Sequence, residues 1–274
     1  MNKKSSLMSR LAGAPYIVWA ALFIIVPLCM VAYYAFTDNT GAFTIQNITG
    51  LVKYTDTFLL SIWLGLVATV LCLVIAYPLA YIMAQKGPEK QSTMTMLIML
   101  PMWMNFLLRT YSWMTILEDT GLINTVITSL GFEPLQLINT RGAVVLGMVY
   151  NFLPYMILPI YTVMLKTDRS LIEAAQDLGG NKLDVFRNVT IPLSVPGIVS
   201  GFTMVFVPSV STFYISQKLG GTGTILIGDI IETQFQTANN FNLGASLSFV
   251  LMILIFICLA VMNRFSDDDG GVIL

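Results

Sequence analysis

The chain has 274 residues, of which 56% are apolar and only 11% are charged, and its formal net charge is −1. A soluble domain usually carries about 25% charged residues, so this composition excludes a disordered chain and an ordinary soluble enzyme. The balanced charge also argues against nucleic acid as a partner, because a nucleic-acid binder carries a basic patch.

Six long runs without a charged residue divide the chain, and each can hold one membrane-spanning helix. A helix needs roughly 20 apolar residues to cross about 30 Å of hydrocarbon. The third run is short, and its helix is expected to continue past Arg109 to Leu117. The sequence therefore predicts an all-α, polytopic membrane protein with six transmembrane helices. The predicted helix cores are Tyr16–Phe36, Phe58–Met83, Met94–Leu108, Ala143–Leu165, Val195–Ser216 and Ala245–Met262.

The positions of Lys and Arg predict the orientation of these helices. If both termini are cytoplasmic, ten of the 14 cations lie inside, as the positive-inside rule requires. The inner cations are Lys3, Lys4, Arg10, Lys86, Lys90, Lys166, Arg169, Lys182, Arg187 and Arg264, and the outer ones are Lys53, Arg109, Arg141 and Lys218. The first apolar run has no clear cleavage site after small residues, so we expect an uncleaved span.

The residues that usually carry metal or acid–base chemistry are scarce. The chain has no histidine, which removes histidine bases and histidine metal ligands. Cys29, Cys72 and Cys258 each lie singly within an apolar run and are interpreted as small core residues. We therefore expect no catalytic residues, no metal site and no cofactor.

The inner segment 166–190 has the pattern of two short helices. Ser170, followed by Glu173, fits a capping box at the start of the first. Leu171, Ala174, Ala175 and Leu178 then share one helical face. Gly179-Gly180 offers a left-handed exit, Asn181 can cap the second helix, and Pro192 precedes the fifth span. The pattern fits either an amphipathic segment on lipid headgroups or a surface that docks on a soluble partner, and the small alanines favour docking.

These residues resemble the EAA loop of permease subunits of ABC importers. The likeness rests on Glu173-Ala174-Ala175, on Gly179 four residues later, and on Ile191-Pro192-Leu193. It implies the type I (MetI-like) permease fold, and it implies that Glu173, Ala174, Ala175, Leu178, Gly179 and Pro192 couple the chain to an ATPase.

Further segments are similar to polyamine permeases. They include residues 100–113 around Trp103 and Asn105, residues 149–154 around Asn151, and residues 213–221 around Tyr214. The likeness extends from about Tyr16 to Arg264. It implies an N-terminal region 1–57 with the first span, a permease domain 58–263 and a C-terminal tail 264–274.

The resemblance also implies partners and a mechanism. A second permease subunit would complete the path, two ATP-binding subunits would bind inside, and an extracytoplasmic binding protein would deliver a polyamine such as spermidine or putrescine. The chain itself has no G-x-x-x-x-G-K-[ST] motif, so ATP hydrolysis is expected from another subunit. The expected location is the bacterial cytoplasmic membrane, and the expected mechanism is alternating access.

Polyamines are cations, so carboxylates and aromatic faces are the candidate substrate contacts. No Asp or Glu lies inside the six helix cores, and the nearest carboxylates are those of Glu118, Asp119, Asp229 and Glu232 at the outer ends. The aromatic candidates near the same level are Trp103, Tyr111, Trp113, Tyr150, Tyr155, Phe213 and Tyr214. Hydration of an outer loop and an interfacial aromatic belt remain open alternatives for these residues.

Three polar residues near or within the spans have expected structural roles. Arg109 is expected to pair with an outer carboxylate or a carbonyl, and Asn105 and Asn151 are expected to form hydrogen bonds between helices. Two alternatives remain for the whole chain: a permease of the same fold for iron(III), thiamine or an anion, and more remotely a polytopic membrane enzyme.

Overall fold

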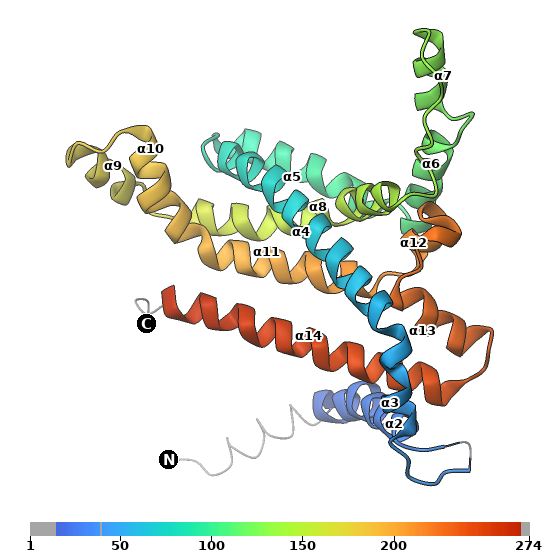
Figure 1. Ribbon diagram of the computed structural model, residues 1–274. Coiled ribbons are helices and arrows are strands. Elements are labelled where there is room, and N and C mark those ends of the chain that lie inside the picture. Colours follow the sequence, from blue (N-terminus) through green and yellow to red (C-terminus); the bar gives the residue numbers. More distant parts are fainter. Residues whose placement is uncertain (1–14, 39, 270–274) are drawn as a thin grey trace, which may run out of the picture. The chain divides into compact units, whose positions relative to one another are not determined.

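The computed structural model describes residues 15–38 and 40–269, and the chain folds into helices throughout this part (Figure 1). Five helical segments there are long and apolar enough to cross a membrane: Pro15–Ala35, Gln46–Ala84, Arg141–Lys166, Lys182–Ser211 and Phe241–Met262. They correspond to five of the six predicted spans, so the predicted all-α membrane fold is confirmed. Lys3, Lys4, Arg10 and the last five residues of the C-terminal tail lie outside the described residues.

The first of two compact units joins the N-terminal span to the start of the last span. Its elements are η1 (Ala21–Ile25), α2 (Val26–Ala35), α3 (Gln46–Thr49) and η2 (Gly50–Tyr54), with most of α13 (Ile227–Gln236) and the first part of α14 (Phe241–Asp269). Asn242 Nδ2 donates to the carbonyl of Thr37 at 2.6 Å, and Ser246 Oγ donates to that of Ala35 at 3.3 Å. Side chains of α14 thus satisfy carbonyls at the end of α2 that have no partner within that helix.

The second unit holds the elements from α4 to the beginning of α13. These are α4 (Thr55–Ala84), α5 (Pro88–Trp103), α6 (Phe106–Leu117), α7 (Leu122–Ser129), α8 (Arg141–Lys166), α9 (Arg169–Asp177), α10 (Lys182–Val185), η3 (Phe186–Thr190), α11 (Ile191–Ser211), α12 (Tyr214–Leu219) and η4 (Gly221–Gly223). Helices α8 and α11 lie side by side at its centre (Figure 1). An added Cβ on Gly197 would lie 3.0 Å from the Cα of Ile160, so the missing side chain lets the two backbones approach.

Most side chains buried in the interior of this unit are apolar. One cluster gathers around Leu64, Met148 and Leu219, and a second gathers around Cys72 and Met156. The predicted core position of Cys72 is therefore confirmed, and Cys258 is half-buried. Cys29 is exposed, so its predicted core position is wrong. An apolar run in a membrane protein cannot distinguish a residue that faces lipid from one that faces other helices.

The third predicted span is wrong as one continuous helix. Helix α5 ends at Trp103, and α6 begins only at Phe106. Asn105 is the N-cap between them, and its side-chain oxygen accepts the backbone N–H of Leu107 at 2.8 Å. Asn is a preferred N-cap because its oxygen replaces a missing helical acceptor, so it separates two helices within one uncharged run. The predicted interhelical hydrogen bond of Asn105 is therefore also wrong.

Two other predicted helix boundaries also differ from the structure. The fifth span ends at Ser211 rather than Ser216, and a separate helix, α12, begins at Tyr214. At its other end, α10, η3 and α11 follow one another without a break from Lys182, with Pro192 in the first turn of α11. The inner segment therefore continues directly into a membrane span.

Candidate functional site

The segment that resembles the EAA loop forms helix α9 at one end of the α8–α11 pair (Figure 1). The predicted capping box is wrong, because Asp168 rather than Ser170 is the N-cap. Its carboxylate accepts the backbone N–H of Ser170 at 2.9 Å, and this hydrogen bond holds the pKa of Asp168 below its usual value. An ionised carboxylate at this position also interacts favourably with the helix dipole. The helix therefore starts two residues earlier than the sequence pattern suggested.

The exit from α9 has the predicted left-handed turn. Gly179 has a φ of +87°, a conformation that L-residues other than glycine rarely adopt. The side chain of Asn181 then caps α10, where it accepts the backbone N–H groups of Leu183 and Asp184, and Asp184 completes a capping box. The caps and the glycine give this short segment a defined shape, although it lies outside the apolar core.

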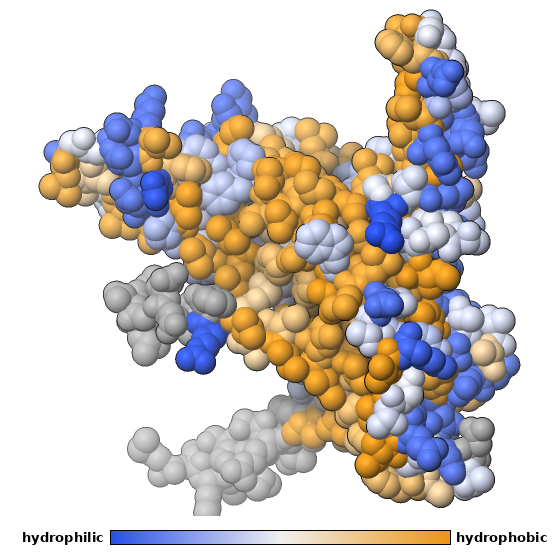
Figure 2. Space-filling model, viewed as in Figure 1, coloured by the Kyte–Doolittle hydropathy of each residue, from blue (hydrophilic) through white to orange (hydrophobic). Residues whose placement is uncertain are grey.

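The predicted docking residues lie on the surface of this segment. Glu173 and Ala174 are exposed, Ala175 is half-buried, and Leu178 is 90% exposed. Pro192 is exposed one helix further along. Figure 2 shows polar and apolar side chains mixed at this end of the unit. A helix with an exposed leucine and small residues has the composition of a surface that another protein can cover.

An aromatic contact fixes this segment to the membrane helices. The ring of Phe186 makes T-shaped contacts with two tyrosine rings of α4. The distance between ring centroids is 5.8 Å to Tyr77 and 5.4 Å to Tyr81. The hydroxyl groups of Tyr77 and Ser194 share a hydrogen bond of 3.0 Å, which joins α4 to α11. Direct contacts thus connect η3 to α4 and α4 to α11.

An aromatic cluster lies at the opposite end of the same unit. The ring of Tyr214 on α12 lies 6.1 Å from that of Tyr111 and 5.8 Å from that of Phe106, both on α6. The ammonium group of Lys218 lies 5.4 Å from the Tyr111 ring centroid and 5.7 Å from that of Tyr214. The two tyrosine faces are thus arranged around a cation, which in this structure belongs to the chain itself.

The other predicted pathway residues do not all join this cluster. Trp113 contacts Tyr150 at 5.4 Å between ring centroids, which forms a second aromatic pair. The remaining aromatics, Trp103, Tyr155 and Phe213, are exposed on α5, α8 and the link before α12. Of the carboxylates, Glu118 is half-buried and Asp119 exposed between α6 and α7, whereas Glu232 belongs to the first unit.

The carboxylate of Asp229, at the start of α13, is buried and accepts hydrogen bonds from two other residues. The residue is 7% exposed, and its carboxylate accepts the Ser216 hydroxyl at 2.9 Å and the Leu226 N–H at 2.7 Å. The neighbouring N–H of Ile227 donates to Ser61 Oγ on α4 at 2.8 Å. These bonds tie α12, α13 and α4 together, so Asp229 positions this end of the unit.

Arg109 and Asn151 do not form the predicted contacts. Arg109 is 8% exposed, and neither its Nε nor its Nη1 has a hydrogen-bond partner among the described residues. Its guanidinium carbon instead lies 6.0 Å from the ring of Phe106. Asn151 Nδ2 donates within its own helix to Gly147 O at 2.9 Å, and its Oδ1 has no partner in the described part of the chain. The expected carboxylate or carbonyl partner of Arg109 and the expected interhelical bond of Asn151 are therefore wrong for this chain.

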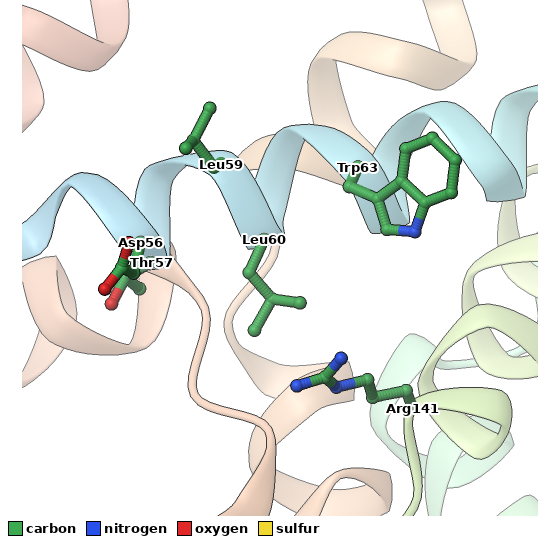
Figure 3. A pocket seen from close by; sticks show the side chains of 6 residues that line it. All are labelled: Asp56, Thr57, Leu59, Leu60, Trp63 and Arg141. Atoms are coloured by element: carbon green, nitrogen blue, oxygen red, sulfur yellow. The ribbon is translucent and has the colours of Figure 1, made fainter.

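An open hollow of about 410 Å³ beside the first turns of α4 contains residues that the sequence did not indicate as functional (Figure 3). Asp56, Leu60 and Trp63 line one side of it, and the guanidinium of Arg141 extends toward Leu60 from the start of α8. Asp56 precedes Trp63 by seven residues. This spacing of two helical turns places both residues on one face of a helix, and it could have indicated the site from the sequence. The hollow combines one carboxylate, one guanidinium and one indole.

Comparisons with known proteins agree with this architecture. Residues 76–267 match the family described as "Binding-protein-dependent transport system inner membrane component". The spermidine/putrescine transport system permease protein PotB of Haemophilus influenzae is 34% identical over 90% of each chain. PotB of Escherichia coli K12 is 35% identical, over 90% of this chain and 94% of that protein.

A solved structure supports the fold over the whole chain. A bacterial ABC transporter chain involved in alginate import superposes with a TM-score of 0.78 at 15% identity, covering 97% of this chain and 96% of that one. At this identity the likeness concerns the fold alone. Together with the family match, it shows that this chain belongs to the family of inner membrane components of binding-protein-dependent transport systems.

Proposed function

We propose that this chain is one of two permease subunits of an ATP-driven importer, and that the imported solute is a polyamine, spermidine or putrescine. The similarity to PotB over 90% of the chain supports this solute. The observation that carries the transport role is the exposed α9 segment, which continues through α10 to η3, where Phe186 contacts two tyrosine rings of α4.

The proposed mechanism is alternating access driven from the α9 end. One of two separate ATP-binding subunits binds the surface formed by Glu173, Ala174, Ala175, Leu178, Gly179 and Pro192. When the two ATP-binding subunits close around ATP, α9 and α10 move with them. The Phe186 contacts transmit this movement to α4, and the unbroken helix from Lys182 transmits it to α11. Such rigid-body movement of packed helices is a common form of structural switching.

The proposed orientation places α9 and both termini in the cytoplasm. The link between α4 and α5, which contains Lys86, and the start of α5, which contains Lys90, lie at the α9 end of their unit in Figure 1, as does the start of α10 with Lys182. Arg141 and Lys218 belong to the opposite end. This separation supports the positive-inside arrangement in the bacterial cytoplasmic membrane. A PotC-like second permease completes the path, membrane lipid surrounds it, and an extracytoplasmic polyamine-binding protein delivers the solute.

The proposed substrate contacts lie at the outer end and rely on aromatic faces. The pairs Tyr111–Tyr214 and Trp113–Tyr150 offer ring faces to an ammonium group, and each contact of this kind contributes about 0.5–2 kcal/mol. Asn105, Glu118, Asp119, Asn151 and Asp229, with Trp103, Tyr155 and Phe213, complete the set of proposed pathway residues.

Uptake measurements test the solute. Cells that lack their own polyamine importers receive the complete transporter, either with or without this chain, and accumulation of labelled spermidine and putrescine is measured. We expect uptake only with this chain. Equal accumulation of both polyamines in the two strains would refute the polyamine assignment, and parallel assays with iron(III), thiamine and an anion would then test the alternatives.

Two charge changes test the role of the α9 segment. We expect Glu173→Lys and Gly179→Asp to abolish transport while ATP hydrolysis and membrane insertion continue, because each alters the proposed docking surface. The matched control is Glu89→Lys, which makes the same change at an exposed position on α5. Normal transport by both α9 variants would contradict the docking role.

A further inference from the structure

Helix α7 carries an apolar face that its own unit leaves exposed. Leu122, Val126 and Leu130 follow one another at four-residue intervals, so they lie on one side of the helix. Leu122 and Leu130 are each 68% exposed, and Val126 is 54% exposed. Phe132, which is 70% exposed, continues this surface beyond the helix. We call Leu122, Val126, Leu130 and Phe132 the α7 face. An apolar face of this kind marks a contact with protein or membrane.

The segment that carries the α7 face has a fixed shape. Asn124 is 1% exposed, and its side-chain amide donates to the carbonyl of Leu135 at 2.9 Å and accepts the N–H of the same residue at 2.8 Å. It also donates to the carbonyl of Glu118 at 3.2 Å, so the side chain of Asn124 links the segment before α7 to the segment after it. Ile123 packs on the apolar core of the unit. The α7 face is therefore preformed, which lowers the entropy cost of binding a partner.

The direction of the α7 face narrows the choice of partner. In Figure 2 the apolar side of α7 is turned toward the side on which α8 and α11 extend, and its polar side is turned away from them (Figure 1). Because α8 and α11 are long enough to cross the membrane, the α7 face is turned toward the membrane layer. A soluble protein that approaches from outside would meet the polar side instead.

The charges near α7 favour a protein over lipid. A helix that lies on a membrane surface is typically rich in Lys and Arg, which attract anionic lipids. No Lys or Arg occurs from Thr110 to Thr140, whereas Glu118, Asp119 and Glu133 all lie in this stretch. The segment thus combines an apolar face with three acidic residues and no cation between Thr110 and Thr140. Its complement is an apolar surface with cations at its edge.

We propose that the α7 face docks on the outer, membrane-level surface of the second permease subunit, at an apolar patch bordered by Lys or Arg. The second permease is the partner that shares the membrane layer, so this inference rests on the proposed function. It assigns the α7 segment to the contact between the two permease subunits.

Copurification tests this assignment. The complete transporter is expressed with an affinity tag on this chain and an epitope tag on the second permease, and the ratio of the two is measured after purification in mild detergent. We expect Val126→Glu to lower the recovery of the second permease at least tenfold, because it places a carboxylate in an apolar contact. The control is Thr128→Glu, which adds the same charge to the polar side of α7 and should leave recovery unchanged.

A crosslinking measurement covers the case in which the Val126→Glu chain inserts poorly. A photoreactive amino acid at position 126 in membranes should crosslink to the second permease, and one at position 128 should not. Equal recovery with both glutamate variants, or a position-126 probe that labels only lipid, would overturn the inference. If the wild-type chain recovered no second permease, the proposed two-subunit transporter would fail as well, so the two failures are distinguishable.

Discussion

Removal of the Phe186 ring tests whether the link between α10 and α4 transmits movement. Phe186 is half-buried and makes T-shaped contacts with Tyr77 and Tyr81 at 5.8 and 5.4 Å. Each aromatic pair contributes about 0.5–1.5 kcal/mol beyond the burial of its surface, so Phe186→Ala should weaken the link by about 1–3 kcal/mol. A change of this size alters a two-state equilibrium about 5- to 150-fold.

The assay compares ATP hydrolysis and solute transport by the whole transporter in proteoliposomes. We expect Phe186→Ala to lower transport at least fivefold with little change in ATP hydrolysis, because the ATP-binding subunits still close but α4 no longer follows. Phe186→Leu keeps apolar volume without a ring and should give an intermediate value. The control is Leu193→Ala, which truncates an exposed apolar side chain one helix further along. Wild-type transport by Phe186→Ala would refute the reasoning.

Three further substitutions address the structure at the opposite end. Asp229→Ala should lower thermal stability by the equivalent of about 1–3 kcal/mol, because the buried N–H of Leu226 loses its acceptor; an unchanged melting temperature would contradict the structural role of Asp229. Lys218→Gln should cost about 0.5–1 kcal/mol of stability through loss of the cation over two tyrosine rings, whereas Lys218→Arg should restore it, and equal melting curves for the two would contradict the contact. Asn105→Ala should cost about 0.5–2 kcal/mol by removing the cap of α6, and a smaller loss for Asn105→Asp would support that cause.

The sequence predicted those spans whose ends coincide with charged residues. The predicted second span, Phe58–Met83, lies within α4, and the predicted fourth, Ala143–Leu165, lies within α8. Charges cannot enter the hydrocarbon layer cheaply, so they delimit these helices well. The third and fifth predictions failed at Asn105, the N-cap of α6, and at Thr212, the C-cap of α11, which are uncharged polar residues inside an apolar run. A hydropathy pattern does not detect such breaks, because uncharged residues change the hydropathy too little; at Asn105 the helix start depends on a local hydrogen bond instead.

The candidate site was predictable where its signals are local in sequence. Gly179 and Asn181 have the turn and the cap that their residue types suggested. The contacts that connect the site to the rest of the unit join residues about a hundred positions apart, such as Phe186 with Tyr81. Arg109 shows the same limit, because the burial of its Nε and Nη1 without a hydrogen-bond partner among the described residues depends on how α6 packs. The hydropathy periodicity of a sequence does not predict which side chains that are distant in sequence contact each other.

The break at Met104 has a consequence for how the chain crosses the membrane at this position. Helix α5 has 16 residues, which at 1.5 Å per residue give a length of about 24 Å. The hydrocarbon layer is about 30 Å thick, so α5 by itself is about 6 Å too short to cross it. At this position the chain ends its crossing with α6, which departs in a different direction in Figure 1. Helices α5 and α6 must therefore cross together the layer that α8, with 26 residues, is long enough to cross alone.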